Sequence, residues 1–162
     1  MFRKLIYPVI FCLSCSVIAE PLTISGKAVK VLAGDLIIFQ DEAEKKYTVR
    51  LEGIDAPEKD QEFGQRASQK LNSLLSLSEH QVEIVYENKD RKGHLIATVY
   101  PYPKERNTVS FNKILVEHGY AWAYRKYSMN YVRDEEVARK EKKGLWAKSN
   151  AVAPWEWRKQ KK

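Results

Sequence analysis

Three segments rich in β-branched and apolar side chains follow one another between residues 22 and 54, with only short turns between them. These segments are Leu22–Leu32, Asp35–Gln40 and Lys46–Ile54, and Gly34 marks the first turn. Three consecutive strands joined by short turns predict an antiparallel meander. This beginning argues against a doubly wound sheet, in which helices alternate with parallel strands.

The hydrophobic period changes after the third strand. Apolar side chains then recur at steps of three and four residues and predict an amphipathic helix over residues 62–77; they are Phe63, Ala67, Leu71, Leu74 and Leu75. Strand character returns at residues 81–87 and 95–100, on either side of a polar turn over residues 88–93. The sequence therefore predicts five strands, with a helix inserted between the third and the fourth.

The last third of the chain is predicted to be helical. Ser110 is placed to cap a short helix that ends at His118-Gly119, and Asn130 is placed to cap a charged helix to Lys143. Five strands with about three helices predict an α+β fold, and their order is that of a five-stranded OB-fold β-barrel. No internal repeat or low-complexity linker divides the chain, so we expect one folded domain.

The first nineteen residues have a different composition from the rest. A short basic start is followed by a nearly apolar run over residues 5–18, and Val17-Ile18-Ala19 offers small residues for cleavage before Glu20. This pattern predicts a secretory signal peptide over residues 1–19, a folded domain over 20–157 and a frayed basic tail over 158–162. The apolar run is shorter than the roughly 20 residues that span a bilayer. We therefore expect export to the periplasm or the medium without stable membrane insertion, and a monomer.

Cysteine content and charge limit the chemistry. Cys12 and Cys15 are the only cysteines, and both lie in the predicted signal peptide, so the mature chain would have no disulfide, thiol nucleophile or cysteine ligand for zinc. The formal charge of the whole chain is +7, and loss of Arg3 and Lys4 reduces it to +5. This excess suits an anionic polymer as substrate, although many proteins carry a similar charge as a solvated surface.

Three carboxylates and an arginine gather around two turns. Asp35 follows Gly34, and Arg50, Asp55 and Glu58 lie in the run from Val49 to Glu58. If they converge, the carboxylates form an all-oxygen site for a hard divalent cation, and the guanidinium is left for an anion. Each residue alone has an ordinary alternative, as a turn residue or as an exposed ion pair worth roughly 0 to 1 kcal/mol. A cation and a guanidinium together indicate phosphate chemistry.

The same residues resemble the staphylococcal-type nucleases, or thermonucleases, in particular their secreted bacterial members. The resemblance runs through the following segments: Gly34-Asp35, Arg50-Leu51-Glu52-Gly53-Ile54-Asp55-Ala56-Pro57-Glu58, Phe63-Gly64, Asp90-Arg91, Gly119-Tyr120-Ala121-Trp122, Tyr124-Arg125-Lys126-Tyr127, Gly144-Leu145-Trp146 and Pro154-Trp155-Glu156-Trp157-Arg158. It implies an OB-fold nuclease domain over residues 20–157. It also implies hydrolysis of DNA and RNA phosphodiesters that depends on Ca²⁺ and leaves 3′-phosphate products.

The resemblance also implies roles for single residues. Asp35 and Asp55 match the calcium carboxylates, and Ala56 matches a position that supplies a backbone carbonyl. Glu58 matches the general base that orients the attacking water, and Arg50 matches a phosphate-binding arginine.

Two positions depart from the family pattern. His94 stands where a second active-site arginine is expected, and Leu36 stands where threonine is usual beside the metal-binding aspartate. A histidine is largely neutral at pH 7 and lacks the two-pronged donor of a guanidinium, so reduced activity is expected. Two alternatives are that His94 protonates the leaving 5′-oxygen and that Arg91 reaches the site instead. The change at Leu36 leaves manganese or magnesium open as alternatives to calcium.

An aromatic and basic cluster near residue 125 predicts contact with substrate. Tyr124 and Tyr127 are placed to stack on bases, and Arg125 is placed to hold a phosphate, although about half of the residues in such a cluster usually serve packing. Two other functions remain open: a barrel that binds nucleic acid but has lost turnover with the second arginine, and an interaction module on the same barrel.

Overall fold

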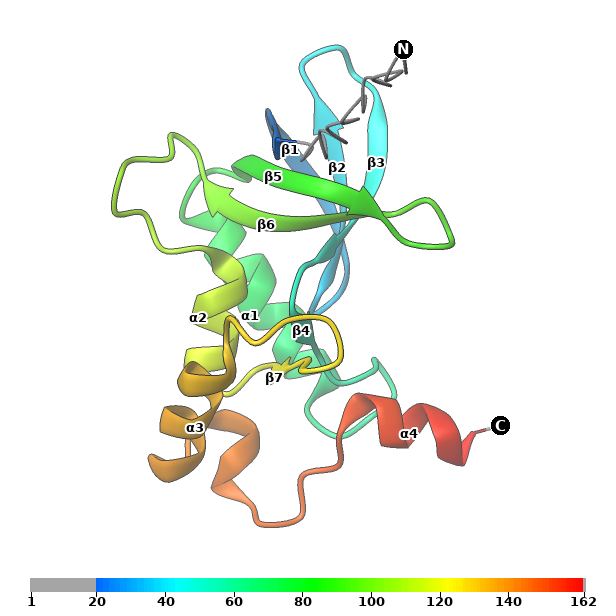
Figure 1. Ribbon diagram of the computed structural model, residues 1–162, viewed down its shortest axis with the longest axis vertical. Helices are drawn as coiled ribbons and strands as arrows, with labels where there is room; N and C mark the ends of the chain where they lie inside the picture. The colour runs from blue at the N-terminus through cyan, green and yellow to red at the C-terminus, as the bar shows by residue number, and fades with distance from the viewer. Residues whose placement is uncertain (1–19, 162) are drawn as a thin grey trace, which may run out of the picture.

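The computed structural model describes residues 20–161, so the predicted signal peptide lies outside the described residues (Figure 1). The elements of this part are, in chain order, β1 (Leu22–Ala33), β2 (Leu36–Asp41), β3 (Lys46–Leu51), β4 (Ile54–Asp55), α1 (Gly64–Ser76), β5 (Gln81–Lys89), β6 (Leu95–Pro101), α2 (Phe111–Glu117), β7 (Trp122–Ala123), α3 (Val132–Lys140), the 3₁₀-helix η1 (Gly144–Ala147) and α4 (Pro154–Gln160).

Five strands close into a barrel in the order β1-β2-β3-β6-β5. Every neighbouring pair is antiparallel except β3 and β6, which run parallel because α1 and β5 intervene between them along the chain. The predicted α+β fold with a five-stranded OB-type barrel is therefore confirmed. The strand bounds agree with the predicted ones to within a few residues.

Alternation along the strands fills the barrel. The inward positions are apolar and almost fully buried on each of β2, β3, β5 and β6; they include Ile37, Phe39, Val49, Leu51, Val82, Ile84, Leu95, Ala97 and Val99. Helix α1 places its apolar stripe against the same core, where Ala67, Leu71, Leu74 and Leu75 are buried. The helices gather at one end of the barrel (Figure 1).

Helix α2 is fixed by its first turn. The side chain of Ser110 accepts a hydrogen bond from the backbone N–H of Lys113, as expected for a helix cap. The next turn carries a fully buried Asn112, which donates to the carbonyls of Glu52 and Ala97 and accepts from the N–H of Val99. This side chain joins α2 to the barrel wall.

The structure differs from the predicted elements at three places. Helix α3 follows Tyr131 without a side-chain cap and ends at Lys140, so the prediction that Asn130 caps a helix to Lys143 is wrong. The third strand ends at Leu51 rather than Ile54, because Gly53 turns the chain with a φ of 70° and Ile54–Asp55 then pairs with β7. Helix α4 was not predicted. It begins at Pro154, which suits the first turn of a helix, and it continues to Gln160, so the expectation of a frayed tail from Arg158 is wrong for residues 158–160.

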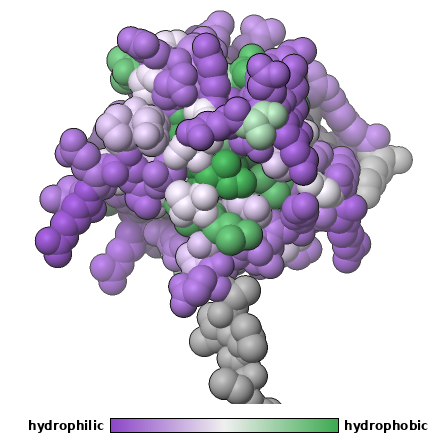
Figure 2. All heavy atoms as spheres, turned by 90° about the horizontal axis from the view of Figure 1, so that it is seen from above, coloured by the Kyte–Doolittle hydropathy of each residue, from purple (hydrophilic) through white to green (hydrophobic). Residues whose placement is uncertain are grey.

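Polar side chains dominate one face of the molecule (Figure 2). Figure 2 views the molecule from above Figure 1 and shows a face covered mainly by hydrophilic residues, with a small apolar area near its centre. No helix within residues 20–161 is both long enough and apolar enough to cross a membrane.

Candidate active site

The turn between β1 and β2 brings Asp35 beside Arg50. Strand pairing places Leu36 opposite Arg50, and the N–H of Leu51 donates to the carbonyl of Asp35 at 2.9 Å. A Cβ on Gly34 would lie 2.8 Å from the Cβ of Ala56, so only glycine allows the turn this close approach. The Gly34-Asp35 pair noted in the sequence thus has a steric reason.

The short β4 strand brings Asp55 to the same place. Asp55 pairs with Trp122 of β7, and its side chain is 1% exposed. One guanidinium nitrogen of Arg50 contacts Oδ2 of Asp35 at 3.3 Å and Oδ1 of Asp55 at 3.2 Å. Ala56 joins the cluster through its backbone N–H, which faces Oδ2 of Asp35 at 3.4 Å. Asp35, Asp55 and Arg50, three of the four residues expected to converge, thus lie together in the fold, and the backbone of Ala56 lies beside them.

Burial makes the charge on Asp35 costly. Removal from water is the main cause that raises the pKa of Asp35 to about 6; Arg50 acts in the opposite direction, and the charges of Asp55 and Glu58 add to the increase. A buried carboxylate with two carboxylate neighbours gains most from a ligand of positive charge. The electrostatics of this position therefore favour cation binding.

Glu58 lies on the loop between β4 and α1. Gln61 holds this loop, since its Oε1 accepts from the N–H of Glu58 at 3.1 Å and its own N–H donates to the carbonyl of Glu58 at 2.9 Å. The Glu58 side chain is 37% exposed, so it is reachable from solvent beside the buried aspartates. This is a suitable position for a group that contacts water.

A second arginine enters the cluster from the C-terminal helix. Arg158 Nη2 contacts Oδ2 of Asp55 at 2.7 Å, and its Nη1 contacts Oδ1 of Asp55 at 3.1 Å and Oε1 of Glu58 at 2.7 Å. The hydrogen bonds to Asp55 raise the pKa of Arg158 above its ordinary value, so it is positively charged at any working pH. Arg158 was not predicted as a site residue: it ends the Pro154–Arg158 segment of the family resemblance, but its basic neighbours indicated a frayed tail.

His94 and Arg91, the residues predicted to act where the family has a second arginine, do not contact the Asp35–Asp55 cluster within the described part of the chain. His94 immediately precedes β6, and its ring nitrogen Nδ1 contacts Oδ2 of Asp90 at 2.8 Å. Burial raises the pKa of Asp90, but hydrogen bonds from the backbone N–H groups of His94 and Lys92 outweigh it and hold that pKa below its ordinary value. Arg91 is exposed on the same turn. No hydrogen bond or ion pair within residues 20–161 joins His94 or Arg91 to the Asp35–Asp55 cluster.

The predicted substrate-binding cluster divides into two parts. Tyr124 stacks on Trp155 of α4 at 5.4 Å and meets Tyr127, which is 72% exposed, edge to face at 5.0 Å. Arg125 instead contacts the fully buried Glu135 at 3.2 Å. Tyr127 therefore offers an open ring for stacking, whereas the Arg125 guanidinium is engaged in holding α3.

The donor set fits a hard divalent cation. Asp35 and Asp55 lie close enough for one nitrogen to contact both, and carboxylate oxygens are the ligands that calcium prefers. Within residues 20–161 no group of three or more histidine, cysteine, aspartate or glutamate side chains is arranged to hold a metal. Any cation here would thus take most of its ligands from backbone carbonyls and water.

The barrel and this cluster define an OB-fold protein whose carboxylates and guanidinium groups suit phosphate chemistry. The family model described as "Staphylococcal nuclease homologue" matches residues 48–148. A protein of Escherichia coli O157:H7 named "Uncharacterized endonuclease" is 36% identical over 161 residues, which is 98% of this chain and 99% of the relative.

Two further relatives carry related names. One from Shigella flexneri, named "Micrococcal nuclease", is 38% identical over 147 residues, covering 85% of this chain and 82% of its own length. One from Haemophilus influenzae, named "Uncharacterized endonuclease", is 37% identical over 138 residues, covering 84% of this chain and 74% of its own length. The chain belongs to the family of staphylococcal nuclease homologues, as the resemblance predicted, and its class is that of a nuclease.

Proposed function

We propose that this chain is an exported, calcium-dependent and sugar-nonspecific endonuclease that hydrolyses DNA and RNA phosphodiester bonds and leaves 3′-phosphate products. The observation that carries the proposal is the linked cluster of Asp35, Asp55 and Glu58 with two guanidinium groups at one end of the barrel. Family membership supports the nuclease class, and the apolar N-terminal segment supports export. The basic charge of the chain supports a polyanionic substrate.

The reaction is an in-line attack of water on phosphorus. Glu58 orients the water and accepts its proton as the new O–P bond forms, and its partial exposure gives water access to its carboxylate. The bond from phosphorus to the 5′-oxygen breaks, and that oxygen takes up a proton. The products are a 3′-phosphate and a 5′-hydroxyl.

Charge develops on the phosphoryl oxygens as the water attacks. Arg50 is 32% exposed and projects from β3, so it is placed to donate to these oxygens. Asp35, Asp55 and the carbonyl of Ala56 would hold calcium, which supplies a positive charge that polarises the phosphate. The affinity for calcium need not be high, because extracellular calcium modules bind it with dissociation constants of about 0.1 to 1 mM.

A nucleic-acid-binding barrel without turnover is the second candidate. The observation that favours this candidate is His94, which contacts Asp90 and supplies no guanidinium at the position where a second active-site arginine is expected. Such a protein would bind DNA with an affinity that falls steeply with salt, as phosphate contacts require.

Cleavage of denatured DNA separates the two candidates. The protein used spans residues 20–162, which include every element of the described fold, and it is assayed with calcium or with a chelator. Cleavage that requires calcium and falls about a hundredfold or more in Glu58→Gln supports the nuclease. Folded protein that binds DNA but never cleaves it contradicts the proposal and supports the binding protein.

A further inference from the structure

The Arg158 guanidinium occupies a position equivalent to that of Arg50. Both donate to the same oxygen, Oδ1 of Asp55, at 3.1 Å and 3.2 Å respectively. Arg158 also reaches Glu58, which Arg50 does not among the contacts of residues 20–161. The two arginines thus flank the predicted catalytic carboxylates from opposite ends of the sequence.

Helix α4 is held firmly enough to deliver this side chain. Trp155 lies between two aromatic rings, stacked on Tyr124 at 5.4 Å and edge to face with Trp122 at 5.4 Å. Because Trp122 pairs directly with Asp55, this packing fixes the first turn of α4 against the strand that carries the buried aspartate. Arg158 follows one turn later.

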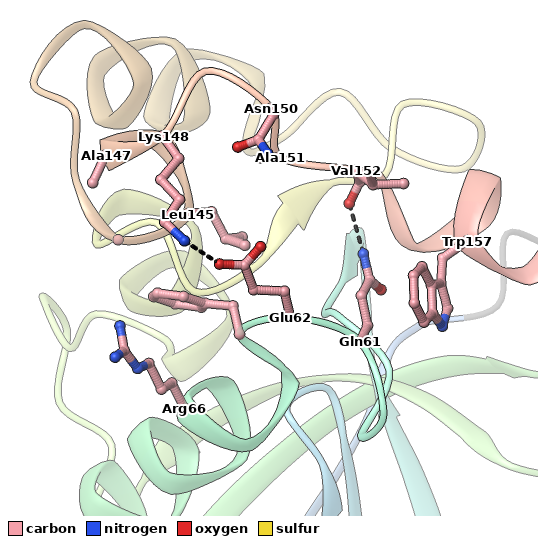
Figure 3. A pocket seen from close by; sticks show the side chains of 12 residues that line it. Gln61, Glu62, Arg66, Leu145, Ala147, Lys148, Asn150, Ala151, Val152 and Trp157 are labelled. Atoms are coloured by element: carbon pink, nitrogen blue, oxygen red, sulfur yellow. Dashed lines mark hydrogen bonds and ion pairs between the residues drawn. The ribbon is translucent and has the colours of Figure 1, made fainter.

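The segment before α4 is fastened to the loop of Glu58. Gln61 donates to the carbonyl of Val152 at 2.7 Å, and Lys148 contacts Glu62. Figure 3 shows both contacts at a pocket that is lined by residues of the segments 61–66 and 144–157. Gln61 therefore contacts both the loop that carries Glu58 and the segment that precedes α4. These contacts couple the position of Glu58 to that of Arg158.

The charges in this cluster indicate how a bound cation and a phosphate would affect the contacts of the two arginines. Asp55 is the carboxylate that both guanidinium groups contact, and a cation held by Asp35 and Asp55 would offset its charge and weaken those contacts. Each guanidinium then has donors available for another anion, and a phosphodiester bound next to Glu58 lies within the reach of both. A phosphorane-like transition state spreads its charge over several oxygens, so two bidentate donors stabilise it better than one.

We propose that Arg158 is a catalytic residue of the nuclease, a guanidinium that is supplied by the C-terminal helix and donates to the scissile phosphate together with Arg50. This inference rests on the proposed function. It also accounts for a chain that has His94 in the turn before β6, because the second guanidinium comes from α4 instead.

The test compares Arg158→Gln and Arg158→Lys with Lys159→Gln in protein spanning residues 20–162. Lys159 is the matched control, because it lies on the same helix, has the same charge and contacts only Glu156 among the described residues. With calcium and denatured DNA, R158Q should lose about a hundredfold to a thousandfold in kcat with a smaller change in KM. R158K should recover only part of the rate, because an ammonium lacks the guanidinium fork. K159Q should stay within about twofold of the parent.

A second readout needs no turnover. Binding of a short single-stranded DNA is measured with calcium at several salt concentrations, in a Glu58→Gln background that prevents rapid cleavage. Adding R158Q should reduce the slope of log affinity against log salt by about 0.7, and adding K159Q should not. Tryptophan fluorescence and the melting temperature report folding, since Trp155 and Trp157 lie on α4.

Each result either supports or overturns the proposed catalytic role of Arg158. An unchanged kcat in R158Q would make Arg158 a structural tether, and a raised kcat would make it a group that blocks the carboxylates; both overturn the inference. If R158Q fails to fold, full activity in folded R158K overturns it, and a large loss in folded R158K supports it. A parent protein that never cleaves refutes the proposed function instead, and the salt slope then tests the phosphate contact of Arg158 by itself.

Discussion

Replacing Asp35 by asparagine should stabilise the metal-free protein. The buried carboxylate has a pKa of about 6 in the folded chain against an ordinary value of 3.8. At about 1.4 kcal/mol for each pH unit, ionisation of Asp35 costs the folded state about 3 kcal/mol at pH 7. Asparagine of the same shape removes this cost and keeps an oxygen that can accept from the N–H of Ala56. The pKa of about 6 already includes the attraction of Arg50, so the gain in the free energy of unfolding should approach about 3 kcal/mol.

The raised pKa of Asp35 also determines how the stability of the parent changes with pH. The folded pKa of Asp35 is raised, so between pH 3.8 and about pH 6 the folded state binds more protons than the unfolded state. Stability of the parent therefore falls as the pH rises through this window. Below pH 3.8 the residue is protonated in both states, and the advantage of Asp35→Asn disappears.

Urea unfolding in chelator, followed by tryptophan fluorescence, measures this effect at pH 4 and pH 7. Glu136→Gln, at an exposed carboxylate of α3, is the control and should change stability little at either pH. Calcium should stabilise the parent and leave Asp35→Asn unaffected, since ligand binding to the folded state alone adds stability. The reasoning would be refuted if Asp35→Asn were less stable than the parent at pH 7. It would also be refuted if the two proteins differed in free energy of unfolding by the same amount at both pH values.

Three further outcomes follow from single contacts. Gly64→Ala should lower kcat at least tenfold and cost about 1–3 kcal/mol, because its Cβ would lie 1.8 Å from the carbonyl oxygen of Glu58; an unchanged kcat would show that this loop moves without consequence. Asn112→Ala should cost about 3 kcal/mol in urea unfolding, because the N–H of Val99 and the carbonyl of Glu52 lose their side-chain partner, while the carbonyl of Ala97 keeps the N–H of Glu52. A loss below about 1 kcal/mol would speak against this. Glu135→Gln should cost about 1–3 kcal/mol, because it weakens two ion pairs to a fully buried carboxylate, and a melting temperature equal to that of the parent would contradict it.

The barrel could be predicted from local pattern because each strand carries its own alternation. Phe39 and Val49, for example, are apolar at positions that a period of two directs inward, and both are fully buried. The first active-site group was predictable for a related reason. Asp35 directly precedes β2 and Arg50 lies in β3, and these strands pair in a hairpin, so the short turn and the strand register place the two residues together.

Other features depend on contacts between distant parts of the chain. The small β4–β7 sheet joins Asp55 to Trp122, and no local signal announces a two-residue strand. Arg125 has the composition of a phosphate ligand, yet the buried Glu135 from α3 engages it. His94 stands at the position that the family pattern reserves for an arginine, but its ring is held by Asp90 four residues earlier.

The sequence by itself determined the strands, the amphipathic α1, the family and the acidic residues of the candidate site, because hydrophobic period, turn chemistry and short motifs act over a few residues. Only the tertiary structure decided that Arg158 belongs to this site, 100 residues after Glu58 and 103 after Asp55. The physical reason is that a helix of seven residues with a basic end has no local pattern that fixes its position. Its place depends on the packing of Trp155 against Tyr124 and Trp122, and that packing exists only once the barrel and β7 have formed.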